Sequence, residues 1–409
     1  MIVRTSWEDQ LRKKARQEGM PPLFGPEALA SMPYGAEAAF KKDLARTFLS
    51  VATRIDADAM MRAPLPRAYR TTTRRRVLVN KQNVRLVHGD GADGLVSPLE
   101  PAAHGDIYRA ALSVLSEPRL PLKMVANHLI VRGTYEEHVL ILNVRHVDAD
   151  VVRSARLLVK KVMEKVPSVK SAWLYIDPSS SRYYLETDRP LHGMGAKKLH
   201  GDSVWRQSVA DRLYQIGVFS FTQVNLAMLP SLVDLVTTVS AVVETDVVGD
   251  FYGGYGLFGA AFGTTAKSVV TVDVDDTTVA NARYNIRRAG GKVTAISTSI
   301  TRAAIEKKIP ATDVLILDPP RSGTDKGVIA ALGARKPRRV VELFCGPDEV
   351  RRSVDEWRAV GYGPVRAVPI DLFPGTLGLE CLVVFEPGVS EVVPPRSSRT
   401  PQRTGGRRG

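Results

Sequence analysis

The chain has 409 residues, 44% of them hydrophobic and 24% charged, which suits a globular protein of two or three domains. Only two cysteines occur, Cys345 and Cys381, which excludes a disulfide framework and a cysteine-held metal cluster. No apolar run approaches the ~20 residues that span a bilayer, and the N-terminus lacks the apolar core of a signal peptide. We therefore expect a cytoplasmic protein that does not enter a membrane.

The balance of charges favours a polyanionic partner. Lysine and arginine together number 57 against 43 for aspartate and glutamate, a net charge of +14. Proteins with such a surplus bind phosphate chains through release of counterions. The alternative, a basic protein from a proteome of basic composition, stays open at this point.

Residues 1–66 are predicted to form a basic N-terminal arm and a helix. Residues 1–33 are polar, basic and interrupted by proline and glycine, which favours an extended arm with one short helix. Residues 34–61 show a helical period, carried by Phe40, Leu44, Phe48, Leu49 and Ile55. Pro64 and Pro66 then end the helix.

Residues 67–210 are predicted to form a mixed α+β domain. It begins with a cationic stretch that leads into a strand at residues 77–79, and some of these arginines should contact phosphates in a fixed register. The arginines concerned are Arg70, Arg74, Arg75 and Arg76. The pattern predicts further strands at residues 84–87, 128–132, 138–142 and 171–176, and a helix at residues 149–166.

Near residue 219 the pattern changes to alternating strands and helices. Seven short apolar runs occur, at residues 247–251, 269–274, 293–296, 314–317, 340–344, 365–370 and 379–385. Helical stretches separate the first six, which predicts an α/β fold with a doubly wound, Rossmann-like sheet over residues 211–390. A short turn joins the last two runs, so we expect an antiparallel hairpin at the sheet edge.

The tail, residues 391–409, is predicted to be disordered because it holds almost nothing apolar. Its five arginines should attract a polyanion only diffusely; they are Arg396, Arg399, Arg403, Arg407 and Arg408.

A glycine-rich turn follows the first strand of the predicted sheet. It reads DFYGGYGLFG over residues 250–259, and its glycines permit a tight turn and close approach of a ligand to a helix N-terminus. Asp273 ends the second strand about twenty residues further on, where a carboxylate can accept hydrogen bonds from both hydroxyls of a ribose. An acidic strand-end cap, supported by Asp275 and Asp276, is the alternative.

Two more motifs belong to the same part of the chain. DPPR at residues 318–321 follows the fourth strand, at the edge where ligands bind in open α/β sheets, and its prolines fix the direction of Asp318. A structural turn is the alternative. FTQVN at residues 221–225 holds two amides that could read a polar ligand, whereas by itself it indicates a helix N-cap at Asn225.

A lone cysteine and a lone glutamate complete the set. Cys345 ends the fifth strand just before a predicted helix, and a helix N-terminus lowers the pKa of a thiol. Cys381 lies within an apolar run and is interpreted as inert filling. Glu380 follows a turn that reads DLFPGTLGL. A thiolate that adds to a pyrimidine ring and a base that later removes a proton are what methylation of an unactivated ring carbon requires.

Taken in this order, the segments resemble the RNA uracil-C5 methyltransferases, which make 5-methyluridine in transfer and ribosomal RNA. The resemblance is strongest over residues 219–386 and rests on FTQVN, DFYGGYG, VDV, LDPPRSG and the pair of Cys345 and Glu380. Upstream, the helix at residues 34–55 and the entry at Tyr69 and Arg70 into a strand also look like the family.

The resemblance implies a class I methyltransferase sheet, an RNA-contacting domain at residues 67–210 and a monomer. The side chains that would line a pocket for S-adenosyl-L-methionine are Gln223, Tyr252, Asp273 and Asp318. Cys345 would add to C6 of a uracil extruded from its stack, and Glu380 would remove the C5 proton. The side chains that would bind the RNA, a tRNA or rRNA, are Arg321, Arg70 and Arg74. No metal is expected.

Several positions depart from the family's pattern. Phe344 and Gly346 flank the cysteine where serine and asparagine are usual, Gly378 stands where histidine is usual, and Gly253 where cysteine is usual. The N-terminal cysteines that hold an iron–sulfur cluster in several ribosomal-RNA members are absent, so no cluster is expected.

Two alternatives stay open. One is methylation of a different base or atom, although cytosine-C5 enzymes of RNA place a cysteine after the fourth strand, where this chain has DPPR. The other is a non-catalytic RNA-binding relative that keeps the fold. The retention of both Cys345 and Glu380 favours an enzyme.

Overall fold

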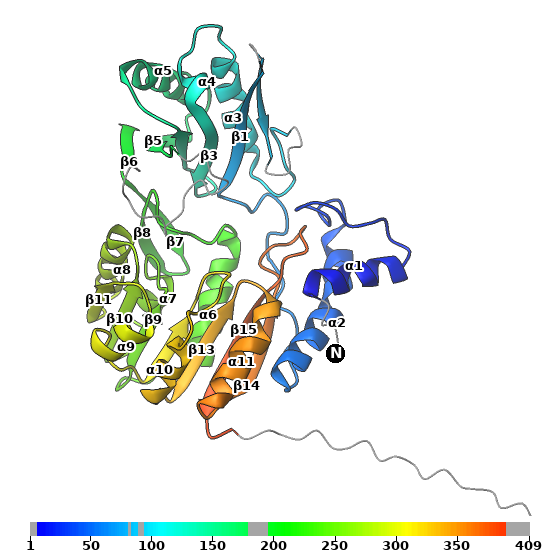
Figure 1. Cartoon of the computed structure of the whole chain (residues 1–409), viewed down its shortest axis with the longest axis vertical. Coiled ribbons are helices and arrows are strands. Elements are labelled where there is room, and N and C mark those ends of the chain that lie inside the picture. The colour runs from blue at the N-terminus through cyan, green and yellow to red at the C-terminus, as the bar shows by residue number, and fades with distance from the viewer. Residues whose placement is uncertain (1–5, 81–82, 89–93, 179–194, 390–409) are drawn as a thin grey trace, which may run out of the picture.

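A computed structural model of the chain describes residues 6–80, 83–88, 94–178 and 195–389. The tail predicted to be disordered, residues 391–409, lies outside the described residues. Two large sheets organise the rest, the smaller at the top of Figure 1 and the larger below it. In the described ranges, no helix is both long and apolar enough to cross a membrane.

The larger sheet has the strand order β11-β10-β9-β12-β13-β15-β14. Its strands are β9 (Val247–Phe251), β10 (Ser268–Asp273), β11 (Val293–Ser297), β12 (Val314–Leu317), β13 (Arg339–Phe344), β14 (Tyr362–Ile370) and β15 (Glu380–Pro387). The first five in that order pair in parallel, and β15 runs antiparallel to both neighbours. This arrangement confirms the predicted α/β fold with a Rossmann-like sheet. The expected hairpin forms, but its second strand inserts inside the sheet, so β14 is the edge.

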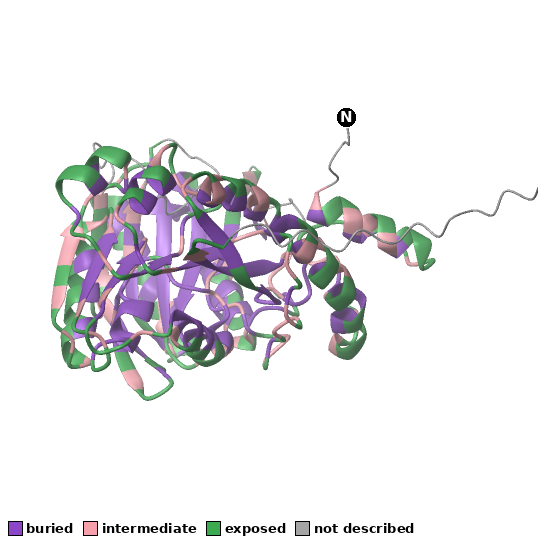
Figure 2. Ribbon diagram, turned by 90° about the horizontal axis from the view of Figure 1, so that it is seen from below, coloured by how far each residue is buried: buried purple, intermediate pink, exposed green. Residues whose placement is uncertain are grey.

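Helices cover both faces of the larger sheet (Figure 1). They are α6 (Leu229–Ser240), α7 (Leu257–Ala261), α8 (Asp276–Arg288), α9 (Arg302–Lys307), α10 (Val328–Ala334) and α11 (Val350–Ala359). A hydrophobic core lies on each face of the larger sheet. Alternate residues of β13 are buried in one core or the other, because successive side chains of a strand point to opposite faces. Val340 and Phe344 share a core with α10 and α11, whereas Val341 and Leu343 share the other with α6. Buried residues accordingly follow the strands in Figure 2, and exposed ones follow the outer sides of the helices.

The smaller sheet has the order β2-β1-β3-β4-β5-β6. Its strands are β1 (Thr73–Asn80), β2 (Asn83–Val87), β3 (Ala126–Gly133), β4 (His138–Val144), β5 (Val169–Ile176) and β6 (Gly195–His200). One face packs on α3 (Ala102–Leu115), α4 (Leu122–Val125) and α5 (Ala149–Lys165). The predicted strands and the helix at 149–166 are therefore present. Helix α3 and a separate hairpin of β7 (Val204–Val209) and β8 (Arg212–Gly217) were not predicted from the sequence.

The β7–β8 hairpin packs on the larger sheet. Trp205 and Ile216 are buried in the same core as α6 and α7, and the side chain of Gln215 donates to Asn281 of α8 at 2.9 Å. Residue 210, where we expected one domain to end, lies in the turn between the two strands.

The N-terminal segment folds against the larger sheet instead of extending from it. Helix α1 (Trp7–Gln17) buries Trp7 and Leu11 in the core that contains α11, and α2 (Tyr34–Thr53) packs on β14 and α11. The prediction that this helix reaches residue 61 is wrong. It ends at Arg54, whose φ of 63° is left-handed, because the next residues hydrogen-bond the edge strand β14: Asp58 N donates to Ala367 O at 2.8 Å.

Candidate active site

The parallel strands bring three of the predicted cofactor residues to one edge. Phe251 of β9 lies opposite Val272 of β10 and Leu317 of β12. The residue after each of these is therefore at the same level, at the carboxyl ends of the strands. These three residues are Tyr252, Asp273 and Asp318. This is the edge where open α/β sheets bind ligands.

The glycine-rich turn is tightly built at its base and open at its tip. A Cβ atom on Gly253 would lie 2.6 Å from Thr271 Oγ1 and 2.8 Å from the backbone oxygen of Asp250, so only glycine fits there. The cysteine usual in the family has no room in this turn. Gly254, with φ of 54°, has no atom within 4 Å of such a Cβ, and Tyr252 also adopts a positive φ of 59°. A non-glycine residue in that region is a strained feature typical of ligand sites.

The carboxylate of Asp273 is held by the backbone of this turn. Its Oδ2 accepts a hydrogen bond from Gly254 N at 2.9 Å, and its Oδ1 accepts one from Val274 N at 2.7 Å. Burial nevertheless raises the pKa of Asp273 above its usual range. Asp275, offered as support for a capping role, instead caps α8 by accepting from Thr278 N. Asp273 itself accepts from Val274 N just past the end of β10, so the strand-end cap offered as the alternative is present.

Asp318 is half-buried and its carboxyl group contacts the FTQVN segment. Burial raises the pKa of Asp318 to about 7, with a further contribution from Asp273, while a hydrogen bond with the side chain of Gln223 opposes the rise. Asp250, below the turn, likewise has its pKa raised to about 7 by burial. Carboxyl groups in this state favour a ligand that brings a positive charge or hydrogen-bond donors.

Strand register brings the cysteine and the glutamate together. Phe344 of β13 lies opposite Cys381 of β15 in an antiparallel pair. The next opposing positions along the two chains are Cys345 and Glu380, since residue numbers in an antiparallel pair change in opposite directions. Both residues lie at the same edge of the sheet as Asp318. The Cys345 thiol donates a hydrogen bond to the backbone oxygen of Pro319, the residue after Asp318, at 3.7 Å.

The prediction that a helix N-terminus lowers the pKa of Cys345 is wrong. Burial raises that pKa, and the carboxylates of Glu380 and Asp318 raise it further, while Arg321 opposes them. Only a short 3₁₀ turn, Pro347–Glu349, follows the cysteine before α11. The dipole effect falls off within a turn, and burial against like charge outweighs it. Cys381 is fully buried in the core, as expected.

Glu380 is 5% exposed and occupies a similar environment. Burial raises its pKa well above the usual range, Asp318 adds to the rise, and Arg321 opposes it. Arg321 is therefore close enough to influence both Cys345 and Glu380, and its contact with a substrate stays a prediction.

Two departures from the family's pattern differ in the space around them. A Cβ on Gly346 would meet no atom within 4 Å, so the residue after Cys345 borders open space. A Cβ on Gly378 would lie 3.1 Å from Thr376 Oγ1 and 3.3 Å from Phe373 Cδ2. A histidine at position 378 would therefore require Phe373 to move.

The four arginines near β1 do not act as one cluster. The strand begins at Thr73, earlier than predicted, so its arginines alternate between faces. Arg75 points to the helix side and is 1% exposed; its guanidinium donates to Glu100 at 2.7 and 3.0 Å and lies 4.5 Å from the Tyr108 ring centroid. Arg75 is therefore not among the arginines of this stretch that can contact a phosphate.

The remaining arginines stay candidates for RNA. Arg74 and Arg76 share the other face of β1, where they lie opposite Ile130 and His128. Arg70 precedes the strand and hydrogen-bonds Tyr69, whose hydroxyl donates to Pro374 O, in the turn before Glu380, at 3.0 Å. Arg70 is thus near the candidate site and the other two are in the smaller sheet.

This division predicts distinct phenotypes. Replacing Arg74 and Arg76 by alanine should weaken RNA binding and flatten the plot of log affinity against log salt by ~0.7–0.9 for each phosphate that is no longer bound. Arg70→Ala should also lower turnover, because RNA held out of place cannot present its base. Arg75→Ala should leave the salt slope unchanged and lower the thermal midpoint, since it leaves Glu100 buried without its partner.

Salt titrations by filter binding, with single-turnover rates at saturating RNA, test this for each variant. Deleting residues 391–409 should weaken binding to all RNAs alike and leave the modified position unchanged. A change in the modified nucleotide on deletion, or full turnover in Arg70→Ala, would contradict the division.

Other polar residues have structural roles that the sequence did not reveal. The predicted N-cap role of Asn225 is wrong: its side chain makes no cap bond and instead donates to Leu372 O, in the turn before Glu380, at 2.9 Å. His104 and His138 are buried with rings 5.2 Å apart. Over the ranges the structure describes, no group of three His, Cys, Asp or Glu side chains could hold a metal ion.

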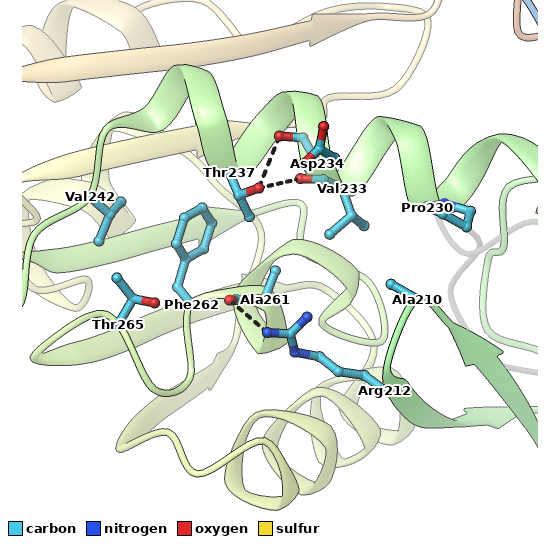
Figure 3. A pocket seen from close by; sticks show the side chains of 10 residues that line it. All are labelled: Ala210, Arg212, Pro230, Val233, Asp234, Thr237, Val242, Ala261, Phe262 and Thr265. Atoms are coloured by element: carbon cyan, nitrogen blue, oxygen red, sulfur yellow. Dashed lines mark hydrogen bonds between the residues drawn. The ribbon is translucent and has the colours of Figure 1, made fainter.

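A surface groove of about 320 Å³ lies elsewhere, between α6, α7 and the turn of β7–β8. Figure 3 shows Arg212 and Asp234 beside it, with Phe262 in its wall. Arg212 donates to Ala261 O at 3.4 Å, and Thr237 bonds the backbone of its own helix. None of the predicted cofactor, catalytic or RNA-binding residues lines this groove, so it is separate from the candidate active site.

Comparison with known proteins identifies the larger-sheet part of the chain. Residues 203–387 match the family described as tRNA (Uracil-5-)-methyltransferase. An uncharacterized RNA methyltransferase of Streptococcus mutans is 27% identical over 267 residues, which are 64% of this chain and 57% of the relative. A second, from Lactococcus lactis, is 26% identical over 261 residues, 63% of this chain and 55% of the relative. The chain thus spans only somewhat more than half the length of these curated relatives.

A solved structure shares the fold over most of the chain. The tRNA (uracil-54, C5)-methyltransferase of Pyrococcus abyssi, in complex with S-adenosyl-L-homocysteine, aligns with a TM-score of 0.67 at 18% identity. The alignment covers 90% of this chain and 86% of that one. Residues 203–387, the stretch that is similar to the tRNA (Uracil-5-)-methyltransferase family, contain every strand of the larger sheet.

Proposed function

We propose that the protein is an S-adenosyl-L-methionine-dependent RNA methyltransferase that forms 5-methyluridine in tRNA or rRNA. The observation that carries the proposal is the register of β13 and β15, whose last pair is Phe344 and Cys381, so that Cys345 and Glu380 are the next residues along the two chains. Both groups lie at the sheet edge that also holds Asp273 and Asp318. A nucleophile and a base at one ligand edge are the two groups that methylation of a uracil carbon needs.

The residues at this edge fit S-adenosyl-L-methionine. Asp273 is oriented by the glycine-rich turn and would accept hydrogen bonds from the ribose hydroxyls. Asp318 and Gln223, which contact each other, would accept from and donate to its polar groups, with Tyr252 beside them. Gly254 leaves the tip of the turn open to a ligand. When bound, this cofactor supplies an electrophilic methyl group carried on a sulfonium.

The chain's own groups would act on the base in two stages. The Cys345 thiolate adds to C6 of uracil, and the electron pair of the C5–C6 bond shifts to make C5 nucleophilic. After C5 has gained its methyl group, the Glu380 carboxylate takes the C5 proton. The electrons of that C–H bond reform the double bond, and the thiolate leaves C6. Arg321 would stabilise negative charge on the base, since its guanidinium acts on both groups.

The raised pKa values predict a pH profile. Burial raises the pKa of the Cys345 thiol and of the Glu380 carboxyl group, and both groups must be ionised to act. We therefore expect the single-turnover rate of methylation to keep rising with pH through and beyond the ordinary thiol pKa of about 8.5. A rate that is flat above about pH 7 would show instead that the thiolate is already formed. Stopped assays at constant ionic strength measure the profile.

Product analysis tests the proposal. The protein should be incubated with unmodified transcripts of tRNA and rRNA and with methyl-labelled S-adenosyl-L-methionine, and the RNA digested to nucleosides. We expect label in 5-methyluridine. Label in 5-methylcytidine or in another nucleoside would support a different base target, and no label with any transcript or with total RNA from a modification-deficient strain would support a non-catalytic RNA-binding protein.

A further inference from the structure

The turn that delivers Glu380 is held by the other end of the chain. We define the catalytic loop as residues 371–379, which join β14 to β15 and end beside Glu380. Five hydrogen bonds join its backbone to described residues among the first 69. Trp7 Nε1 donates to Leu377 O at 2.7 Å, Leu29 N to Gly375 O at 3.0 Å, and Tyr69 Oη to Pro374 O at 3.0 Å. In the other direction, Gly375 N donates to Glu37 Oε1 at 2.6 Å and Asp371 N to Met61 O at 2.9 Å.

A buried ion network fixes the first residue of the catalytic loop. The ammonium group of Lys41 donates to Asp371 Oδ1 at 2.9 Å and to Glu37 Oε1 at 2.8 Å. All three side chains are 0% exposed. Arg67 donates to the second oxygen of Glu37 at 3.0 Å. Two carboxylates and two cations thus meet beneath the loop, and Glu37 links Lys41 to Gly375.

Trp7 joins both halves of the candidate active site. Its backbone N donates to Asp348 Oδ1 at 2.9 Å, three residues after Cys345, and its indole donates to Leu377 O, three residues before Glu380. The ring is buried and lies edge-on to Phe48 at 5.9 Å. One residue therefore ties the nucleophile's segment to the base's segment.

Burying a lysine and two carboxylates costs free energy that a hydrophobic cluster would not, so such a network is weak evidence for stability. The position of the network, beneath the catalytic loop, indicates that it fixes the loop's conformation. The loop contains Gly375 with φ of 83°, and Leu99 packs so closely that a Cβ there would lie 2.5 Å from its Cδ2. Contacts from several directions therefore determine one loop conformation, and with it the place of Glu380.

We infer that Trp7, Glu37 and Lys41 are positioning residues for proton removal: they hold the catalytic loop so that the Glu380 carboxylate reaches the C5 proton. The inference rests on the proposed function, since it assigns these residues to one step of that reaction. The backbone hydrogen bond from Trp7 N to Asp348 stays in a variant that changes only the Trp7 side chain, so addition of Cys345 to C6 should be less affected than proton removal.

Two variants separate positioning from folding. Trp7→Phe keeps an aromatic ring in the core and removes only the indole N–H. Lys41→Met removes the charge under the loop at similar length, and Lys41→Arg should restore part of the effect by supplying a cation again. The matched control is Arg338→Met, which breaks the ion pair of Arg338 with Asp246 at the amino-terminal edge of the same sheet, away from the site.

Amide hydrogen exchange, measured by mass spectrometry, reports how firmly the catalytic loop is held and does not require an active enzyme. In Trp7→Phe and Lys41→Met, peptides covering residues 371–380 should exchange faster while those of β9 and β10 stay as in the wild type. Single-turnover methylation at saturating RNA should fall by about tenfold to a hundredfold, and a covalent RNA complex should accumulate. Cofactor affinity by calorimetry should stay within about twofold, since these residues do not touch that edge.

The inference is overturned if Trp7→Phe and Lys41→Met keep both the wild-type exchange of the loop and the wild-type rate. It is also overturned if Arg338→Met lowers the rate as much, because a general loss of stability would then explain the effect. Should the wild type make no 5-methyluridine, the proposed function fails by itself. Unchanged exchange of the loop would refute the positioning role in either case.

Discussion

Replacing Cys345 by alanine should reduce methyl transfer by more than about 10³-fold and leave binding of S-adenosyl-L-methionine close to that of the wild type. The thiol lies at the end of β13 and touches Pro319 O, whereas the turn that orients Asp273 follows β9. Removing the sulfur therefore removes the group that activates the uracil base and leaves the proposed cofactor site intact. Calorimetry with the cofactor and release of tritium from C5-labelled RNA measure the two properties separately.

Cys381→Ala is the matched control for this experiment. Cys381 is one residue past Glu380 and fully buried in the core, so its loss should lower the thermal midpoint and spare the chemistry. Retained turnover in Cys345→Ala, or equal loss of turnover in both variants, would contradict the assignment of the nucleophile.

Glu380→Gln should give a different phenotype, in which a covalent complex with RNA accumulates. Glutamine fills the same space at the start of β15 but cannot accept the C5 proton, so addition and methylation proceed and elimination stalls. Loss of a positioned general base lowers turnover by about 10²–10⁴-fold. The trapped complex should appear as a retarded band on a denaturing gel, and treatment with ribonuclease should remove the retardation.

Glu342→Gln tests whether any buried carboxylate of the sheet gives the same result. Glu342 lies on β13, accepts hydrogen bonds from Ser353 and Trp357, and has its pKa raised to about 7 by burial. We expect this variant to turn over normally without a trapped complex. A Glu380→Gln protein that is inactive and never becomes linked to RNA would assign Glu380 a structural role.

The larger sheet could be predicted from sequence because its signals are local. β9 and β12 have the bounds expected from their apolar runs, since a short buried strand is marked by its own residues and the turns around it. The carboxyl ends of β10 and β12 also located Asp273 and Asp318 at one edge. The helix starting at Tyr34 was expected from its period, but its end was not, because pairing with β14 competes with the helix after Thr53.

What sequence could not supply depends on contacts between distant segments. In the sequence, Arg75 is indistinguishable from the other arginines of a basic stretch. Its position on the buried face of β1, where it pairs with Glu100, becomes visible only in the folded structure. The thiol pKa of Cys345 depends on Glu380 and Asp318, which no local pattern places beside it. Lys41 and Asp371 are separated by 330 positions, so the helical period that predicted α2 could not reveal the ion pair between them.

The central claim is that Cys345 forms a bond to C6 of a uracil in RNA, and a mechanism-based trap tests it directly. The wild type should be incubated with S-adenosyl-L-methionine and RNA in which uridine is replaced by 5-fluorouridine, whose C5 fluorine cannot be removed as a proton. The account predicts a complex that survives denaturation, and peptide mapping by mass spectrometry should locate the attached nucleotide on Cys345. Absence of a complex with a transcript that the enzyme methylates, or attachment at Cys381, would contradict it.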